Sequence, residues 1–151
     1  MIDDLIIRIA DEEDLPEILK LYSQPDMDNN NVLEPHDAKV IFSKMESYPD
    51  YHVYIAEKND IVVGTFALAI LDNLAHVGSK SGLIEDVVVA QSYQGQGVGK
   101  RMMETAIEMC KDKSCYKVCL SSNLIRQNSH EFYENIGFKK HGFSYLVDLE
   151  K

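Results

Sequence analysis

The stretch from Ile84 to Cys110 constrains the fold most strongly, because it combines a strand pattern, alternating glycines and a helical stripe. Residues 84–89 read Ile-Glu-Asp-Val-Val-Val, which is β-branched and apolar enough for a buried strand. Beyond the glycines, apolar residues recur on one helical face at Val98, Met102, Met103, Ala106, Ile107 and Cys110. A glycine loop that opens a helix suits a phosphate or pyrophosphate, because backbone amides approach the ligand closely and the helix start is partly positive.

The spacing of the loop decides between three phosphate motifs. A P-loop needs a glycine and a Ser or Thr where Gln94 and Arg101 stand, and a dinucleotide fingerprint needs glycine where Lys100 stands. Both patterns therefore fail, and Gln-x-x-Gly-x-Gly over residues 94–99 remains. A glycine-rich turn without a ligand also stays open at this point.

With this loop and a second motif about thirty residues later, the sequence resembles the GNAT superfamily of acyl-CoA-dependent N-acetyltransferases. The second motif, Arg-Gln-Asn-Ser-His-Glu-Phe-Tyr-Glu-Asn-Ile-Gly-Phe at 126–138, is similar to a late helix of that superfamily, with Ser129 in place of the usual Ala. Gly137 is a suitable residue to end that helix. Residues 84–89 followed by Cys-Tyr-Lys-Val at 115–118 are similar to glucosamine-6-phosphate N-acetyltransferases, which we treat as a hint about the substrate.

Strand-helix-strand passages mixed with hairpins predict an α/β three-layer sandwich with a mixed central sheet, in a single domain over 1–151. The resemblance implies that the strands from Ile84 and Tyr116 run parallel and splay apart around the acetyl-pantetheine arm of acetyl-CoA, the expected co-substrate. It also implies a set of cofactor-binding residues: Val87, Val88, Val89, Gln94, Gly95, Gln96, Gly97, Val98, Gly99, Lys100, Asn128 and Tyr133.

The chemistry of N-acetylation points to Glu85 and Tyr133. The attacking amine must be neutral, so a carboxylate that takes its proton directly or through water is the natural base. Strict alternation predicts that Glu85 shares a face with Val87 and Val89, while Asp86 points to the opposite face as a structural acceptor. Tyr133 matches the tyrosine that in many GNAT enzymes donates a proton or hydrogen bond to the coenzyme A sulfur. The alternatives are a cap or salt bridge for Glu85 and a core position for Tyr133.

The rest of the chain is assigned by periodicity and turn residues. We expect Asp14 to cap a helix through an Asp-x-x-Glu pattern, and a second helix over 37–47 to bury Val40, Ile41 and Met45. Gly64 inside a strand predicts a bulge or a close backbone approach. The remaining elements are strands at 5–9, 51–57, 61–70 and 116–120, loops at 23–35 and 71–81, a helix at 126–136 and a final hairpin at 138–149.

Composition narrows the partners. Fifteen Lys and Arg against 25 Asp and Glu give a formal charge of −10, which disfavours nucleic acid and anionic membranes and suits a cationic small molecule. The acidic N-terminus and the lack of a long apolar run predict a soluble, cytoplasmic protein. Three cysteines without a Cys-x-x-Cys pair predict buried thiols and no metal. A homodimer is one assembly open to such a chain.

These observations favour an enzyme that transfers an acetyl group to the primary amine of a small molecule by direct attack in a ternary complex. Glucosamine 6-phosphate is one candidate substrate, and the acidic balance favours a polyamine, an amino acid or an aminoglycoside instead. A non-catalytic acyl-CoA-binding regulatory module and an enzyme that acetylates protein amines are the remaining alternatives.

Overall fold

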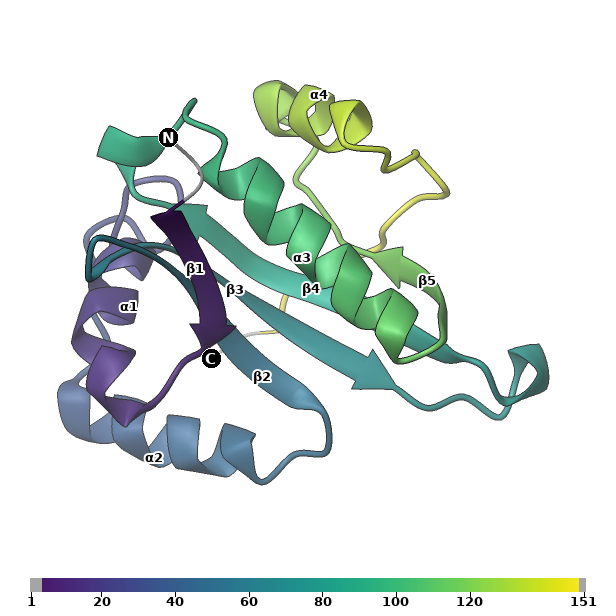
Figure 1. Ribbon diagram of the computed structural model, residues 1–151, viewed down its shortest axis with the longest axis horizontal. Coiled ribbons are helices and arrows are strands. Elements are labelled where there is room, and N and C mark those ends of the chain that lie inside the picture. The colour runs from purple at the N-terminus through teal and green to yellow at the C-terminus, as the bar shows by residue number, and fades with distance from the viewer. Residues whose placement is uncertain (1–3, 150–151) are drawn as a thin grey trace. The chain divides into compact units, whose positions relative to one another are not determined.

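The computed structural model describes residues 4–149, in which five strands form one sheet in the order β1-β2-β3-β4-β5. The strands are β1 Leu5–Ile9, β2 Tyr51–Lys58, β3 Ile61–Leu71, β4 Lys80–Val89 and β5 Cys115–Cys119. Consecutive strands from β1 to β4 pair antiparallel, and β5 pairs parallel to β4. The sheet is therefore mixed, as the sequence predicted (Figure 1).

The α-helices of the described chain are α1 Leu15–Tyr22, α2 Pro35–Glu46, α3 Val98–Asp112 and α4 Gln127–Asn135. The chain divides into a first unit that ends at Cys119 and a second unit that begins at Leu120 and contains α4. No helix among residues 4–149 has the length and apolar character needed to cross a bilayer.

The first unit has three layers, with helices on both faces of the sheet (Figure 1). On one face α3 packs so closely that a Cβ added at Gly64 would lie 2.7 Å from Met102 Sδ, and one added at Gly82 would meet Cys110. Ala67, on the opposite face of β3, lines a cavity together with residues of α1 and α2. The predicted α3 stripe is buried, except that Ile107 is half-buried.

The β2–β3 hairpin forms as predicted. Asn59 and Asp60 have φ of 51° and 60°, the left-handed conformation of a two-residue hairpin turn. Ala56 pairs with Gly64 and Glu57 with Val62, so one extra residue of β3 bulges beside Gly64. Gly64 thus serves both expected purposes, a bulge and a close approach to a neighbouring element.

The expected inward face of the second helix is wrong for Val40 and Ile41 and confirmed for Met45. Ala38 and Phe42 are the buried residues of α2, whereas Val40 is 57% exposed and Ile41 48% exposed. Met45 is half-buried and lies on the stripe that Ala38 and Phe42 begin. The buried face of α2 is therefore rotated by about one residue from the predicted face. Phe42, and not Val40 or Ile41, enters the core.

The expected cap of the first helix is also wrong, because the Asp14 carboxylate is used elsewhere. It accepts a hydrogen bond from the Asp11 backbone amide at 2.8 Å and two from the Arg8 guanidinium at 2.7 and 2.9 Å. Asp11 in turn caps a short 3₁₀ turn at Glu12–Asp14, and α1 begins after it without a side-chain cap.

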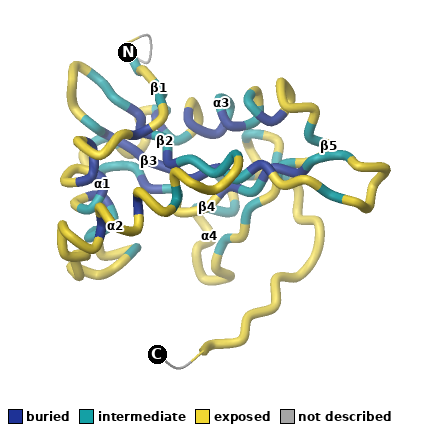
Figure 2. Tube along the Cα trace, turned by 90° about the horizontal axis from the view of Figure 1, so that it is seen from below, coloured by how far each residue is buried: buried dark blue, intermediate teal, exposed yellow. Residues whose placement is uncertain are grey.

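Two further boundaries differ from the expectations. The loop predicted at 71–81 is shorter, because β3 runs to Leu71 and β4 already begins at Lys80. The hairpin predicted at 138–149 is wrong, since the described residues there form no strand and are exposed after Phe138. Figure 2 shows this segment in yellow along its length after α4.

Candidate active site

The glycine loop connects the end of β4 to the start of α3. Gly95 and Gly97 have φ of 72° and 88°, and Gly97 is the N-cap residue of α3, without a side-chain cap. The first backbone amides of a helix have no partner within it. Gln94 and Gln96 fold their side-chain amides back onto the carbonyls of Val89 and Ser92, at 3.1 and 2.7 Å. The loop therefore presents backbone donors at a helix start, an arrangement that fits a pyrophosphate.

One edge of β4 opens beside this loop. β5 pairs with β4 from Lys80 to Leu83, and β4 continues to Val89. The Ala90 amide donates to Val63 of β3 at 2.8 Å, so alternation directs the amides of Val89 and Val87 toward the opened edge. The Val89 carbonyl on that edge accepts the side-chain amide of Gln24 at 3.2 Å as well as that of Gln94.

A β-bulge in β4 corrects the expected direction of its side chains. Thr65 pairs with Val88 and Ala67 pairs with Glu85, so Asp86 and Val87 together face Phe66. Asp86 has a φ of 53°, a left-handed conformation that aspartate tolerates better than most residues. Because of the extra residue, the strict alternation of side chains between the two faces, on which the sequence prediction relied, is interrupted at Asp86 and Val87.

The bulge places Glu85 and Asp86 on one face. Glu85 lies opposite Ala67, which lines the cavity beside α1 and α2, and Asp86 lines the same cavity. Val89 lies opposite Gly64, which faces α3, and alternation puts Val87 on that face as well. Glu85 therefore does not share a face with Val87 and Val89, and Asp86 does not point away from Glu85.

The cavity beside α1 and α2 has a volume of about 220 Å³. Its polar groups are the carboxylates of Asp28 and Asp86, the hydroxyls of Tyr22 and Tyr51, and the side chain of Asn31. Its other lining residues are Leu15, Ile18, Leu19, Leu33, Ala38, Ile41, Phe42, Met45, Val53 and Ala67. We call it the acceptor-side cavity, because it lies on the face of β4 that carries Glu85.

Burial and neighbouring charge favour proton uptake by the carboxylates here. Partial burial, and secondly the charge of Asp86, raise the pKa of Glu85 above its ordinary value. Burial, and secondly the charge of Asp28, raise the pKa of Asp86. The pKa of Tyr51 is raised by burial first and then by the charges of Asp86 and Glu85, which agrees with the bulge geometry.

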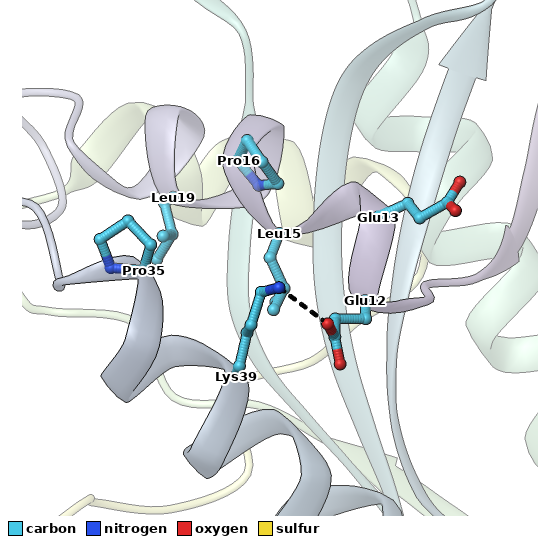
Figure 3. A pocket seen from close by; sticks show the side chains of 7 residues that line it. All are labelled: Glu12, Glu13, Leu15, Pro16, Leu19, Pro35 and Lys39. Atoms are coloured by element: carbon cyan, nitrogen blue, oxygen red, sulfur yellow. Dashed lines mark ion pairs between the residues drawn. The ribbon is translucent and has the colours of Figure 1, made fainter.

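A second cavity, of about 250 Å³, lies where the start of α1 meets α2 (Figure 3). Its walls are Glu12, Glu13, Leu15, Pro16, Leu19, Pro35 and Lys39. Lys39 Nζ forms an ion pair with Glu12 Oε1 at 3.0 Å, drawn as a dashed line in Figure 3. Since its cation is neutralised within the protein, this cavity presents no free charge pair for catalysis.

The second unit contains the other predicted site residues. Tyr133 on α4 is half-buried and packs edge-on against Phe132 and Phe138, with ring centroids 5.1 and 5.8 Å away. Burial raises the pKa of its hydroxyl. Nε2 of His130 lies 2.7 Å from the Asn123 carbonyl oxygen, and Asn128 is exposed.

The structure thus brings Glu85, Val87, Val88, Val89 and the loop from Gln94 to Lys100 together within the first unit, whereas Asn128 and Tyr133 belong to the second. Sequence reasoning missed Gln24, whose side-chain oxygen Oε1 also accepts a hydrogen bond from the Gln91 backbone amide at 3.1 Å. A single glutamine in a polar loop carries no signal that would have identified it. It likewise missed Tyr22 and Tyr51, which read as ordinary core and strand residues.

Comparisons with known proteins agree with this geometry. The model of the acetyltransferase (GNAT) family matches residues 13–138. A glucosamine 6-phosphate N-acetyltransferase of Trypanosoma brucei brucei is 31% identical over 97% of both chains. The enzyme of the same name from Candida albicans is 32% identical over 73% of both. The crystal structure of a Trypanosoma brucei acetyltransferase superposes with a TM-score of 0.83 at 31% identity, over 97% of this chain and 100% of that one.

A match over most of the chain, full-length relatives and a superposable fold lead to one assignment: the chain belongs to the acetyltransferase (GNAT) family and is an acetyl-CoA-dependent N-acetyltransferase.

Proposed function

We propose that this enzyme transfers the acetyl group of acetyl-CoA to the primary amine of a small molecule by direct attack in a ternary complex, with Glu85 as base and Tyr133 as acid. The observation that supports the proposal most strongly is the bulge at Asp86. Because of this bulge Glu85 and Asp86 share one face of β4, where Asp86 lines a cavity, while the opened edge of the same strand leads to the glycine loop.

The glycine loop and the opened edge fit the two polar parts of the co-substrate. The backbone amides at Gln94–Lys100 would hold the pyrophosphate, since the helix start and two left-handed glycines aim donors at an anion. The amides of Val87 and Val89 would hold the pantetheine arm in place of a neighbouring strand, while Val88 fills the core and Asn128 would touch the same arm. When bound, acetyl-CoA supplies an activated thioester to the site.

Glu85 would accept the proton that an alkylammonium must lose before it can attack, directly or through one water. Its raised pKa brings it closer to the working pH and makes it a better proton acceptor than an ordinary glutamate. The amine nitrogen then forms a bond to the acetyl carbon and the bond from that carbon to sulfur breaks. Tyr133, whose pKa is raised by burial, would donate its hydroxyl proton to the departing sulfur. The nitrogen loses a second proton as it becomes an amide, and that proton would return to the tyrosinate through solvent, so the reaction releases the one proton held by Glu85.

Glucosamine 6-phosphate is the second candidate substrate, in place of an unspecified amine. Relatives of that name match this chain over most of its length, and the residues of β4 and β5 that resemble such enzymes lie on the two strands that open. The acceptor-side cavity argues against this substrate, because the described residues that line it include two carboxylates and no lysine, arginine or histidine.

We also propose that the protein works in the cytoplasm as a homodimer. The three cysteines are free thiols, which suits a reducing compartment. The C-terminal part of the described chain has an exposed apolar stretch of the kind that a second copy would cover, formed by Phe143, Tyr145, Leu146, Val147 and Leu149. Sedimentation should give a dimer, and a monomer at micromolar concentration would contradict this part of the proposal.

The experiment on the base is Glu85→Gln, which keeps the size of the side chain and removes its proton acceptor. The kcat with a small amine should fall about a hundredfold, while the Kd for acetyl-CoA should stay unchanged. Glu17→Gln, on the exposed side of α1, is the matched control and should keep the parent rate. If Glu85→Gln turned over like the parent, the base would be a water or another carboxylate.

A further inference from the structure

The acceptor-side cavity has an uneven distribution of charge. Among the described residues that line it, two are carboxylates and none is lysine, arginine or histidine. Lys20 and Lys39, on the two helices beside it, are paired with Glu17 and Glu12 at 3.7 and 3.0 Å. A ligand in this cavity thus meets negative charge without a compensating cation from the residues that line it.

The two carboxylates come from separate elements whose backbone is held by local structure. Asp86 is fixed by the bulge of β4. Asp28 belongs to the loop after α1, where its amide donates to the Tyr22 carbonyl at 2.9 Å and its carbonyl accepts the Asn31 side-chain amide at 2.7 Å. Without a ligand, the charge of Asp28 disfavours the ionised form of Asp86. A bound cation would remove that repulsion.

The remaining walls define the body of the ligand. Most of the lining side chains are aliphatic or aromatic, and Tyr22 and Tyr51 add hydroxyls at the side of β4. The volume of about 220 Å³ is below the roughly 300–1,000 Å³ typical of sites for drug-sized ligands. The cavity therefore suits a small, largely apolar molecule with one cationic end.

We infer that the acceptor of this enzyme is a small primary amine with an apolar body and no anionic group, and that Asp28 and Asp86 select it over phosphorylated amines. This inference rests on the proposed function, because it assigns the acceptor to the cavity on the Glu85 side of β4. It disfavours glucosamine 6-phosphate, because a phosphate that entered this cavity would meet two carboxylates and no lining cation.

Matched amines test the selectivity, with thiol release from acetyl-CoA as the readout. Of 2-phenylethylamine, glucosamine and glucosamine 6-phosphate, the first should have the highest kcat/KM. The kcat/KM for glucosamine should exceed that for glucosamine 6-phosphate by about tenfold, and since the two sugars differ only in the phosphate, this ratio measures the effect of the phosphate. A preference for glucosamine 6-phosphate over glucosamine would overturn the inference. It would mean that cations from outside this cavity receive the phosphate, and the proposed function would still stand.

Two variants test the carboxylates. Asp86→Asn keeps a residue that tolerates the left-handed backbone, and it should raise the KM for 2-phenylethylamine about tenfold with a smaller change in kcat. Asp28→Asn, on the surface loop, should raise the same KM about threefold without affecting the fold. Both variants should reduce the difference in kcat/KM between glucosamine and glucosamine 6-phosphate, and Glu17→Gln should leave that difference unchanged. An unchanged KM and an unchanged difference in both variants would refute the assignment.

Calorimetry separates this inference from the proposed function. 2-Phenylethylamine should bind the parent protein and bind Asp28→Asn about threefold more weakly. If it bound in this way without any thiol release, direct acetyl transfer would be wrong while the assignment of the cavity stood. If it did not bind, the inference would be wrong whatever the enzyme acetylates.

Discussion

Gly97→Ala is the sharpest perturbation of the glycine loop. Gly97 has φ 88° and ψ 0° at the N-cap of α3, a conformation that costs an alanine about 1–2 kcal/mol. For a chain of this length that cost lowers the melting temperature by about 2–8 °C. If the loop relaxes to avoid the strain, at least one of its amides no longer points at the pyrophosphate. One lost hydrogen bond to a charged group is worth about 1.5–3 kcal/mol, so the Kd for acetyl-CoA should rise about tenfold to a hundredfold.

Gly78→Ala is the matched control for this variant. Gly78 also has a positive φ, of 74°, and a Cβ added there would make only an ordinary contact with the Asn73 carbonyl at 3.9 Å. Both variants should lose similar stability in thermal denaturation, and only Gly97→Ala should lose affinity in calorimetry with acetyl-CoA. If a folded Gly97→Ala bound acetyl-CoA as tightly as the parent, the pyrophosphate would not lie on this loop.

Three further predictions concern protons and charge. The kcat/KM of the parent should decrease on acidification with an apparent pKa above the ordinary glutamate value of 4.5, because burial and Asp86 raise the pKa of Glu85. An apparent pKa at or below 4.5 would contradict the role of Glu85 as base. Tyr133→Phe should lower kcat about tenfold to a thousandfold with little change in acetyl-CoA affinity or melting temperature. If this variant kept the parent kcat under conditions in which chemistry limits the rate, Tyr133 would be a packing residue and not the acid. Asp14→Asn should cost about 2 kcal/mol of unfolding free energy, since it loses the charged partner of Arg8. Because Arg8 lowers the pKa of Asp14, this contribution is present above pH about 4 and is lost as falling pH titrates the folded carboxylate, so a difference from the parent that did not shrink on acidification below pH about 4 would refute it.

The loop and α3 could be predicted from sequence because their signals are local. The glycines alternate beside a stripe that repeats every fourth residue, and each observation depends only on neighbours along the chain. The helix begins at Val98 as the pattern requires, and Met102 and Ala106 are fully buried. The two left-handed glycines are likewise where a loop of this kind needs them.

The bulge at Asp86 could not be predicted in this way. Residues 84–89 read as an uninterrupted strand, and nothing in the pattern marks one residue as extra. The extra residue is visible only in the register with β3, where Asp86 and Val87 together face Phe66. It reverses the expected face of every side chain beyond it, and it brings Asp86 into the cavity beside α1 and α2.

The other errors arise where the partner of a residue or strand is not specified by the local pattern. Asp14 has the composition of a helix cap, yet Arg8 on β1 and the Asp11 amide compete for the same carboxylate and hold it. Residues 138–149 have enough aromatic and β-branched residues for two strands, but strand formation needs a partner edge that composition does not specify.

Bisubstrate kinetics test the central claim, direct attack of the amine within a ternary complex. Initial rates of thiol release should be measured while acetyl-CoA and a primary amine are varied together, with the N-acetylated product counted by mass spectrometry. Direct transfer should give intersecting double-reciprocal lines, one acetylated amine for each thiol released and no release without the amine. Parallel lines, with a burst of thiol from the enzyme alone, would show that the acetyl group passes through a covalent enzyme intermediate and would contradict the mechanism.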